Sequence, residues 1–179
     1  MPQYVERQLS QLNKLVVQLH RQGEYEQAIS VATEARDLAC RHLGESHPLF
    51  TTSVNNLAGL YTLMGNYTSA EPLLRQVLEI RRRVPGEEHP DFATSLNNLA
   101  ELYHWMGNYV AAEPLYRQAL EIWGRVLGRE HPNFATSLNN LAELYRSMGN
   151  YAAAEPLYLQ ALEVNRKVLG GSTRTLQAA

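Results

Sequence analysis

The polar side chains best suited to chemistry recur at a fixed interval in this sequence. His47, His89 and His131 are 42 residues apart, and the same interval separates Glu101 from Glu143. Histidine is a common metal ligand, paired carboxylates perform acid–base catalysis, and a side-chain amide offers both donors and an acceptor. An asparagine also recurs with this period, as Asn13, Asn55, Asn97 and Asn139.

The interval itself argues against a metal site and against catalysis. Equivalent points of successive helix pairs should lie about 20 Å apart, given interaxial distances of about 8–10 Å. The ligands of one zinc ion must all lie about 2 Å from it, so we interpret the three histidines as helix-capping or loop-packing residues. Glu101 and Glu143 are likewise too far apart to share a proton.

Other signatures of enzymes are missing from the sequence. The glycines punctuate turns and follow no predicted strand, so they do not form a phosphate-binding loop. No arrangement of Ser, His and Asp or of Cys and His suggests an activated nucleophile. We therefore expect no enzyme activity, no cofactor and no metal.

The repeated unit reads as two helices joined by a tight turn. From Pro90 to Met106 apolar residues recur at spacings of three and four, which is typical of an amphipathic helix. Gly107-Asn108 ends this run, because glycine accepts the left-handed conformation and asparagine caps the next helix. A second apolar run extends from Tyr109 to Val126, and His131-Pro132 opens the next unit.

A period of this length is typical of stacked-repeat architectures. We predict an all-α fold, a right-handed α-solenoid of four antiparallel helix pairs that forms a single domain over residues 1–170. The repeats span about 3–45, 47–86, 89–128 and 131–170, and the predicted helices are 3–22, 25–43, 48–64, 67–84, 90–106, 109–126, 132–148 and 151–168. Residues 171–179 lack the repeat pattern and are interpreted as a frayed tail or as the stub of a longer chain.

Three prolines disturb this simple picture. Pro72, Pro114 and Pro156 fall about six residues into the second helix of their units, beyond the first turn, where proline is harmless. Because the apolar pattern continues across each proline, we expect a bend or a widened turn there and not a break.

The overall composition excludes some classes of binding partner. A net charge of −2 gives no sign of a basic nucleic-acid-binding face. The N-terminal residues do not resemble a signal peptide, and no apolar run is long enough to span a membrane. We expect a cytoplasmic protein that binds neither nucleic acid nor membrane. Cys40, the only cysteine, is expected to be a small buried residue.

The repeat resembles a known family. The pattern resembles the tetratricopeptide repeat, whose usual period is 34 residues. The longer period, the His-Pro start, the LNNLA string and the AEPLY string are similar to the subtype found in kinesin light chains and in many bacterial, often cyanobacterial, proteins. In the second copy the residues that carry the resemblance are Leu57, Ala58, Tyr61, Gly65, Tyr67, Ala70, Leu74 and Val77.

The resemblance implies that the first helix of each unit lines a concave groove that binds an extended peptide. The implied peptide-binding residues are Asn13, Asn55, Asn97, Asn139, Thr94, Glu101, His104, Trp105, Thr136, Glu143 and Arg146. The same frame places Ser10, Val17, His20, Arg21, Thr52, Gly59, Thr62, Leu63 and Ser147 on the groove side.

The asparagines admit two interpretations. The first of each pair could hold the main chain of a peptide, which leaves specificity to residues such as Glu101 and Trp105. Alternatively, the asparagines bond to one another or to neighbouring helices and only set the stacking. The second of each pair (Asn56, Asn98 and Asn140) should point toward the adjacent unit.

The charges depart from the kinesin light chain pattern, which implies a basic groove that accepts a tryptophan flanked by acidic residues. Glu101 and Glu143 face the groove here, whereas Arg81, Arg82 and Arg83 are assigned to a solvated outer face. A mixed or basic peptide therefore fits at least as well.

We predict a protein-interaction scaffold that binds a partner protein or an extended peptide segment. The alternatives are a self-assembling module that oligomerises through its last repeat, or a fragment of a larger multidomain protein. The last repeat favours the first alternative, because no capping helix follows its apolar residues Tyr158, Ala161, Leu162 and Val164.

Overall fold

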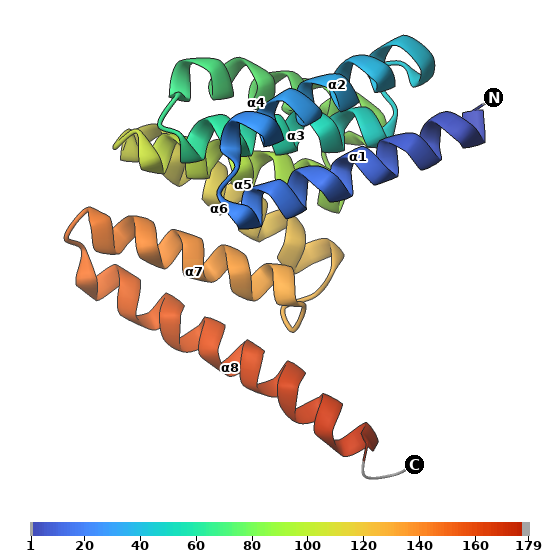
Figure 1. The fold of residues 1–179 in the computed structure, drawn as a ribbon. Coiled ribbons are helices and arrows are strands. Elements are labelled where there is room, and N and C mark those ends of the chain that lie inside the picture. The colour runs from blue at the N-terminus through green and yellow to red at the C-terminus, as the bar shows by residue number, and fades with distance from the viewer. Residues whose placement is uncertain (1, 177–179) are drawn as a thin grey trace. The chain divides into compact units, whose positions relative to one another are not determined.

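The computed structural model describes residues 2–176 (Figure 1). They divide into two compact units at the bond between Val84 and Pro85. The first unit contains α1 (Pro2–Gln22), α2 (Tyr25–Leu43), α3 (Pro48–Leu63) and α4 (Tyr67–Arg81). The second contains α5 (Pro90–Trp105), α6 (Tyr109–Val126), α7 (Pro132–Ser147) and α8 (Tyr151–Leu176). The four predicted helix pairs are confirmed, with boundaries within three residues of the prediction except at the end of α8. One superhelix over all four pairs stays a prediction.

The turns inside each helix pair form as the sequence predicts. Gly107 has a φ of +72°, a left-handed conformation that strongly favours glycine. The next residue, Asn108, caps α6, because its side-chain oxygen accepts a hydrogen bond from the backbone N–H of Ala111 at 3.3 Å. Asn66 and Asn150 cap α4 and α8 in the same way.

The three recurrent histidines are helix caps, as interpreted from the sequence. Nδ1 of His89 accepts a hydrogen bond from the backbone N–H of Asp91 at 3.1 Å. His47 and His131 cap α3 and α7 with the same geometry. Each is followed by a proline, which fits the first helical turn because its missing N–H would have no partner there.

The core of the first unit depends on small side chains. In α2 four alanines at spacings of three and four (Ala28, Ala32, Ala35 and Ala39) are completely buried. They pack in two clusters with larger residues of α1 and α3, such as Leu9, Val16, Phe50 and Leu57. Because a methyl group takes little space, the backbone of α2 can approach both neighbours.

In the second unit α7 packs between α6 and α8, and Figure 1 shows α7 and α8 side by side. A buried cluster joins Phe134 and Leu138 of α7 to Ala161 and Val164 of α8, with Leu120 of α6 packed against it. A polar link reinforces the contact between α6 and α7, since the Tyr145 hydroxyl donates to Glu113 at 2.7 Å and accepts from Arg117.

Proline affects α4 differently from the other helices. Helices α4, α6 and α8 continue through Pro72, Pro114 and Pro156, so the prediction of no break is confirmed. The bend or widened turn expected at these prolines stays a prediction. A widened turn follows α4 at Arg82–Gly86, where Val84 has φ −146° and ψ 112°. A residue that precedes a proline is disfavoured in the α conformation, so Pro85 explains why α4 ends earlier than predicted.

Helix α8 continues to Leu176, eight residues beyond its predicted end, so that boundary was wrong; residues 177–179 lie outside the described residues. The interpretation of residues 171–179 as a tail or as the stub of a longer chain stays a prediction. Two further expectations were wrong. Cys40 is exposed, not buried. Arg81 is not fully solvated, because the residue is half-buried and its guanidinium donates a hydrogen bond to Thr51 Oγ1 at 2.6 Å.

Candidate peptide-binding clefts

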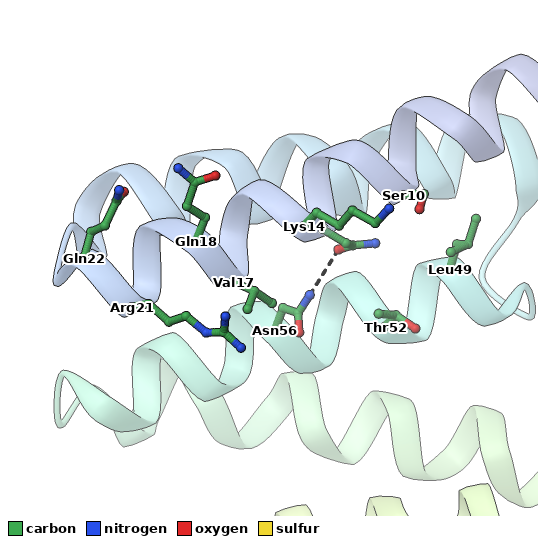
Figure 2. Close-up of a pocket in the computed structure, with 10 residues that line it drawn as sticks. Ser10, Lys14, Val17, Gln18, Arg21, Gln22, Leu49, Thr52 and Asn56 are labelled. Carbon is green, nitrogen blue, oxygen red and sulfur yellow. Dashed lines mark hydrogen bonds between the residues drawn. The ribbon is translucent and has the colours of Figure 1, made fainter. Parts of the chain in front are cut away.

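The first unit has a cleft between α1 and α3, and Figure 2 shows the side chains that line it. Its volume is about 820 Å³. A smaller hollow of about 190 Å³ lies further along the same two helices. The larger cleft is lined by Ser10, Asn13, Lys14, Val17, Gln18, Arg21, Gln22, Leu49, Thr52 and Asn56, and the hollow by Val16, Val17, His20, Asn55, Asn56, Gly59, Leu60 and Leu63.

The predicted groove positions of the first unit thus come together. Of the residues that the resemblance places inward in the first two repeats, only Thr62 lines neither opening. Lys14 was missed, because it occupies the position of the second asparagine in the later repeats, where the side chain should point toward a neighbouring unit. In α1 that asparagine is replaced by lysine, and this replacement in the sequence could have identified Lys14 as a cleft residue.

The cleft of the first unit is basic. Lys14 and Arg21 line it, no carboxylate does, and neither cation forms an ion pair with any described residue. Positive charge that is not neutralised within the chain attracts an anionic ligand.

The asparagines link neighbouring repeats within each unit. Oδ1 of Asn13 accepts hydrogen bonds from Ser53 Oγ at 3.2 Å and from Asn56 Nδ2 at 3.1 Å (Figure 2 draws the latter). Oδ1 of Asn97 accepts from Asn140 Nδ2 at 2.9 Å. Both acceptors are about 90% buried. The second asparagine therefore does reach the adjacent repeat at Asn56 and Asn140.

Part of this asparagine network has no partner inside the protein. Nδ2 of Asn13 and Oδ1 of Asn55 are buried and make no hydrogen bond within the described chain. Buried polar groups almost always have a partner in the protein, in water or in a ligand. Asn13 lines the larger cleft of the first unit, and Asn55 lines the smaller hollow.

The second unit has a cleft of about 520 Å³ between its helix pairs, and it combines aromatic rings with carboxylates. The cleft gathers five of the predicted site residues, Glu101, His104, Trp105, Glu143 and Arg146. It is lined by these five together with Tyr109, Tyr116, Asn140 and Ser147. Of the two tyrosines, Tyr116 is almost fully buried and Tyr109 is half-buried.

Other predicted residues lie outside this cleft. The hydroxyls of Thr94 and Thr136 donate to the carbonyl oxygens of Pro90 and Pro132 in the preceding helical turn, at 3.0 and 3.1 Å. Neither threonine lines the cleft, and neither does Asn139. Their contact with a peptide stays a prediction.

Three polar contacts involve side chains that line the cleft or adjoin it. His104 Nε2 lies 2.9 Å from Ser147 Oγ, which joins α5 to α7. Arg146 forms an ion pair with Glu143, and the Tyr158 hydroxyl donates to Glu143 at 2.6 Å. The hydrogen bonds from Arg146 and then from Tyr158 lower the pKa of Glu143 from 4.5 to about 2.

This shift has a consequence for stability at low pH. A carboxyl group with a lowered pKa stabilises the fold above its unfolded value of about 4.5, and that contribution is lost as the pH falls through the folded value of about 2. The side chain is 41% exposed, so solvent screening limits the effect to no more than about 1 kcal/mol. In a ¹³C NMR titration the carboxyl of Glu143 should have its midpoint near 2. An ordinary midpoint near 4.5 would contradict the assigned contacts, and Glu143→Gln should reduce the acid sensitivity of unfolding.

A further opening of about 690 Å³ lies on the other side of the second unit, between α6, α7 and α8. Apolar side chains such as Leu120 and Phe134 line it beside Arg117, Arg125 and Glu121. Arg117 and Arg125 are already paired with Glu113 and Glu88. None of its residues belongs to the predicted groove.

Within residues 2–176 no cluster of three or more His, Cys, Asp or Glu side chains could hold a metal ion. None of the described helices combines the length and apolar character needed to cross a membrane.

Comparison with known proteins identifies the repeat. Two models of the tetratricopeptide repeat match the chain, one over residues 49–104 and 91–167, the other over residues 9–49. A comparison with curated proteins found no match.

Three solved structures are similar to the chain, and each alignment covers 90% of it. BtubC (BKLC) from P. vanneervenii is 23% identical with a TM-score of 0.79, and the chain covers 65% of that structure. A single-substitution form of a putative kinesin light chain with nearly identical TPR-like repeats from Podosopora anserina is 27% identical, with a TM-score of 0.78 and 76% of that structure covered. A Rap protein complexed with Competence and Sporulation Factor is 17% identical, with a TM-score of 0.78 and 43% covered.

The likeness to the first and third structures shows the fold alone, an all-α repeat of the solenoid class. The family models match well over half of the chain, and a kinesin light chain-like repeat protein is among the structural neighbours. The chain belongs to the tetratricopeptide repeat family.

Proposed function

We propose that this protein is an interaction scaffold that binds an extended peptide segment of a partner protein through the clefts lined by α1 and α3 and by α5 and α7. Tetratricopeptide repeats generally mediate protein–protein interactions. The observation that supports this site is that most predicted groove positions line the cleft or the adjoining hollow of the first unit, or the cleft of the second unit. Their helices are held by packing and caps, so little ordering entropy is lost on the protein side.

The polar groups of the first-unit cleft suit an extended acidic segment. Lys14 and Arg21 would pair with carboxylates of the peptide, whereas Asn13 and Asn55 would bond to its main chain. Main-chain bonds give affinity without sequence preference, and the charged residues then supply the preference.

The test begins with selection of binders from a displayed library of random twelve-residue peptides against the full chain. An Arg21→Glu variant should bind the selected peptides at least about tenfold more weakly, because it replaces an attraction by a repulsion in the cleft. Arg83→Glu is the matched control: it makes the same charge change at an exposed residue outside the cleft, and should change affinity less than about twofold. Equal losses in the two variants, or failure to select any peptide, would contradict the proposal.

A second candidate function is self-association through α8, which a specific observation favours. Leu159 and Leu162 are 59% and 66% exposed. The residues equivalent to Leu159 in α4 and α6 are the arginines Arg75 and Arg117. An apolar residue at a position that is polar in the other repeats indicates a contact surface.

Self-association predicts a concentration-dependent mass. In sedimentation velocity the wild type should form dimers or larger species as its concentration rises, whereas Leu159→Arg should stay monomeric. Val110→Arg alters another strongly exposed apolar residue, outside α8, and should behave as wild type. A wild type that remains monomeric at high concentration would remove this candidate.

A further inference from the structure

Three aromatic rings form a continuous surface at the cleft of the second unit. Trp105 is 62% exposed, which is unusual for a large apolar side chain. The imidazole of His104 stacks beside its indole with a centroid distance of 6.5 Å and an interplanar angle of 25°. Tyr109 approaches the same imidazole edge-on at 5.7 Å. Aromatic faces of this kind attract cations through the ring quadrupole, and tryptophan does so most strongly.

The charged groups around these rings leave an excess of negative charge. Glu143 is neutralised by Arg146. Burial lowers the pKa of His104, so the imidazole is neutral near pH 7. Glu101 is exposed and forms no hydrogen bond or ion pair in the described part of the chain. It lies one helical turn before Trp105, so its carboxylate and the indole share one side of α5.

We propose that this cleft is a receptor for a cationic side chain, an arginine or a lysine, of the bound peptide. The cation would rest against the face of Trp105 and pair with Glu101. The proposal rests on the peptide-binding function above and adds the chemistry of one of its contacts. An acidic side chain would instead meet Glu101, and a purely apolar one would bury this carboxylate without a partner, which is costly.

The other repeats lack this combination. The positions of Glu101 and Trp105 are occupied by Gly59 and Leu63 in the second repeat, and Trp105 corresponds to Ser147 in the fourth. The cleft of the first unit has the opposite charge. A single cation site in the third repeat would therefore select a residue of the peptide and fix its register.

The sharpest probe compares arginine with citrulline, which has nearly the same shape but no charge. Blocked tripeptides Gly-Arg-Gly and Gly-citrulline-Gly are titrated into the ¹⁵N-labelled full chain. The arginine peptide should shift the indole N–H signal of Trp105 and the amide signals around Glu101, with an affinity about tenfold above that of the citrulline peptide. Equal affinity, or shifts located elsewhere, would overturn the proposal.

Two variants test the assigned residues. Trp105→Ser introduces the residue of the fourth repeat, and Glu101→Gln removes only the charge. Each should abolish most of the preference for arginine over citrulline at the amide signals of α5. Glu155→Gln removes a charge from an exposed residue of α8 outside the cleft and should keep the preference. A preference that survives both cleft variants would contradict the proposal.

The two proposals fail in distinguishable ways. If displayed peptides bind the wild type and bind the Arg21→Glu variant more weakly, but the arginine and citrulline tripeptides have equal affinity, the scaffold function is supported and the cation site is contradicted. If the arginine tripeptide binds at Trp105 but no displayed peptide is selected, the cation site is supported and the binding of extended segments is contradicted.

Discussion

An Asn97→Ala variant is expected to lose about 1–3 kcal/mol of unfolding free energy, because the amide of Asn140 would then be left without its acceptor in a partly buried contact. In the wild-type protein this amide donates to Asn97 at 2.9 Å, and Asn97 is 8% exposed. Urea unfolding, followed by circular dichroism, measures the loss.

A double-mutant cycle measures the interaction free energy between Asn97 and Asn140 separately from their contacts with other residues. Asn97→Ala and Asn140→Ala should be strongly non-additive, since either substitution already breaks the same hydrogen bond. Asn139→Ala, at the neighbouring and half-buried residue, is the control and should cost less. Additive losses at Asn97 and Asn140 would show that the bond contributes nothing to stacking.

The second large effect concerns two glycines inside helices, for which the same substitution should act in opposite directions. A Cβ at Gly124 would lie 2.9 Å from Cε2 of Phe134, whereas a Cβ at Gly59 would meet nothing within 4 Å. Alanine favours a helix over glycine by about 0.5–1 kcal/mol. Gly59→Ala should therefore stabilise the protein by about that amount.

Gly124→Ala should instead be destabilising, because overpacking costs about 1–3 kcal/mol and outweighs the gain in helix propensity. Phe134 is 6% exposed and packs against Leu138, Ala161 and Val164, so a shift of its ring away from α6 would disturb this buried packing. Adding Phe134→Leu to Gly124→Ala should recover part of the loss. Thermal unfolding of the variants measures whether each substitution raises or lowers the stability. If Gly124→Ala alone stabilised the protein, this would contradict the close approach of α6 to α7.

The sequence predicts the helices well because each boundary has a local physical cause. His89 and Asn108 cap helices with their own side chains, and Gly107 ends one through its left-handed backbone. The end of α4 was missed where two local signals conflict: the apolar pattern continues to Val84, but Pro85 forces that residue out of the helix.

The clefts were only partly predictable. Helical spacing identifies which backbone positions share one side of a helix, and His104 and Trp105, assigned to the same side of their helix, both line the second-unit cleft. Lys14 was missed because its position, that of the second asparagine in later repeats, was expected to point toward the adjacent repeat and not into the cleft. Helical spacing also does not show which charges pair: the ion pair between Arg146 and Glu143, which leaves Glu101 as the unpaired carboxylate of the cleft, depends on side-chain geometry.

The asparagines illustrate the same difference between position and role. Their recurrence marks a face but does not show which group each amide contacts. In the structure the oxygens of Asn13 and Asn97 are used between repeats. The proposed peptide contacts therefore depend on the remaining groups of the network and on charged residues that vary between repeats, such as Arg21 and Glu101.

The most direct test of the central claim is a map of backbone amide shifts in the labelled full chain on titration with a library-selected peptide. The largest shifts should fall on α1 and α3 around Val17, Arg21 and Thr52, and on α5 and α7 around Glu101 and Arg146. Shifts confined to the outer residues of α4, α6 and α8, with the cleft residues unchanged, would contradict the account.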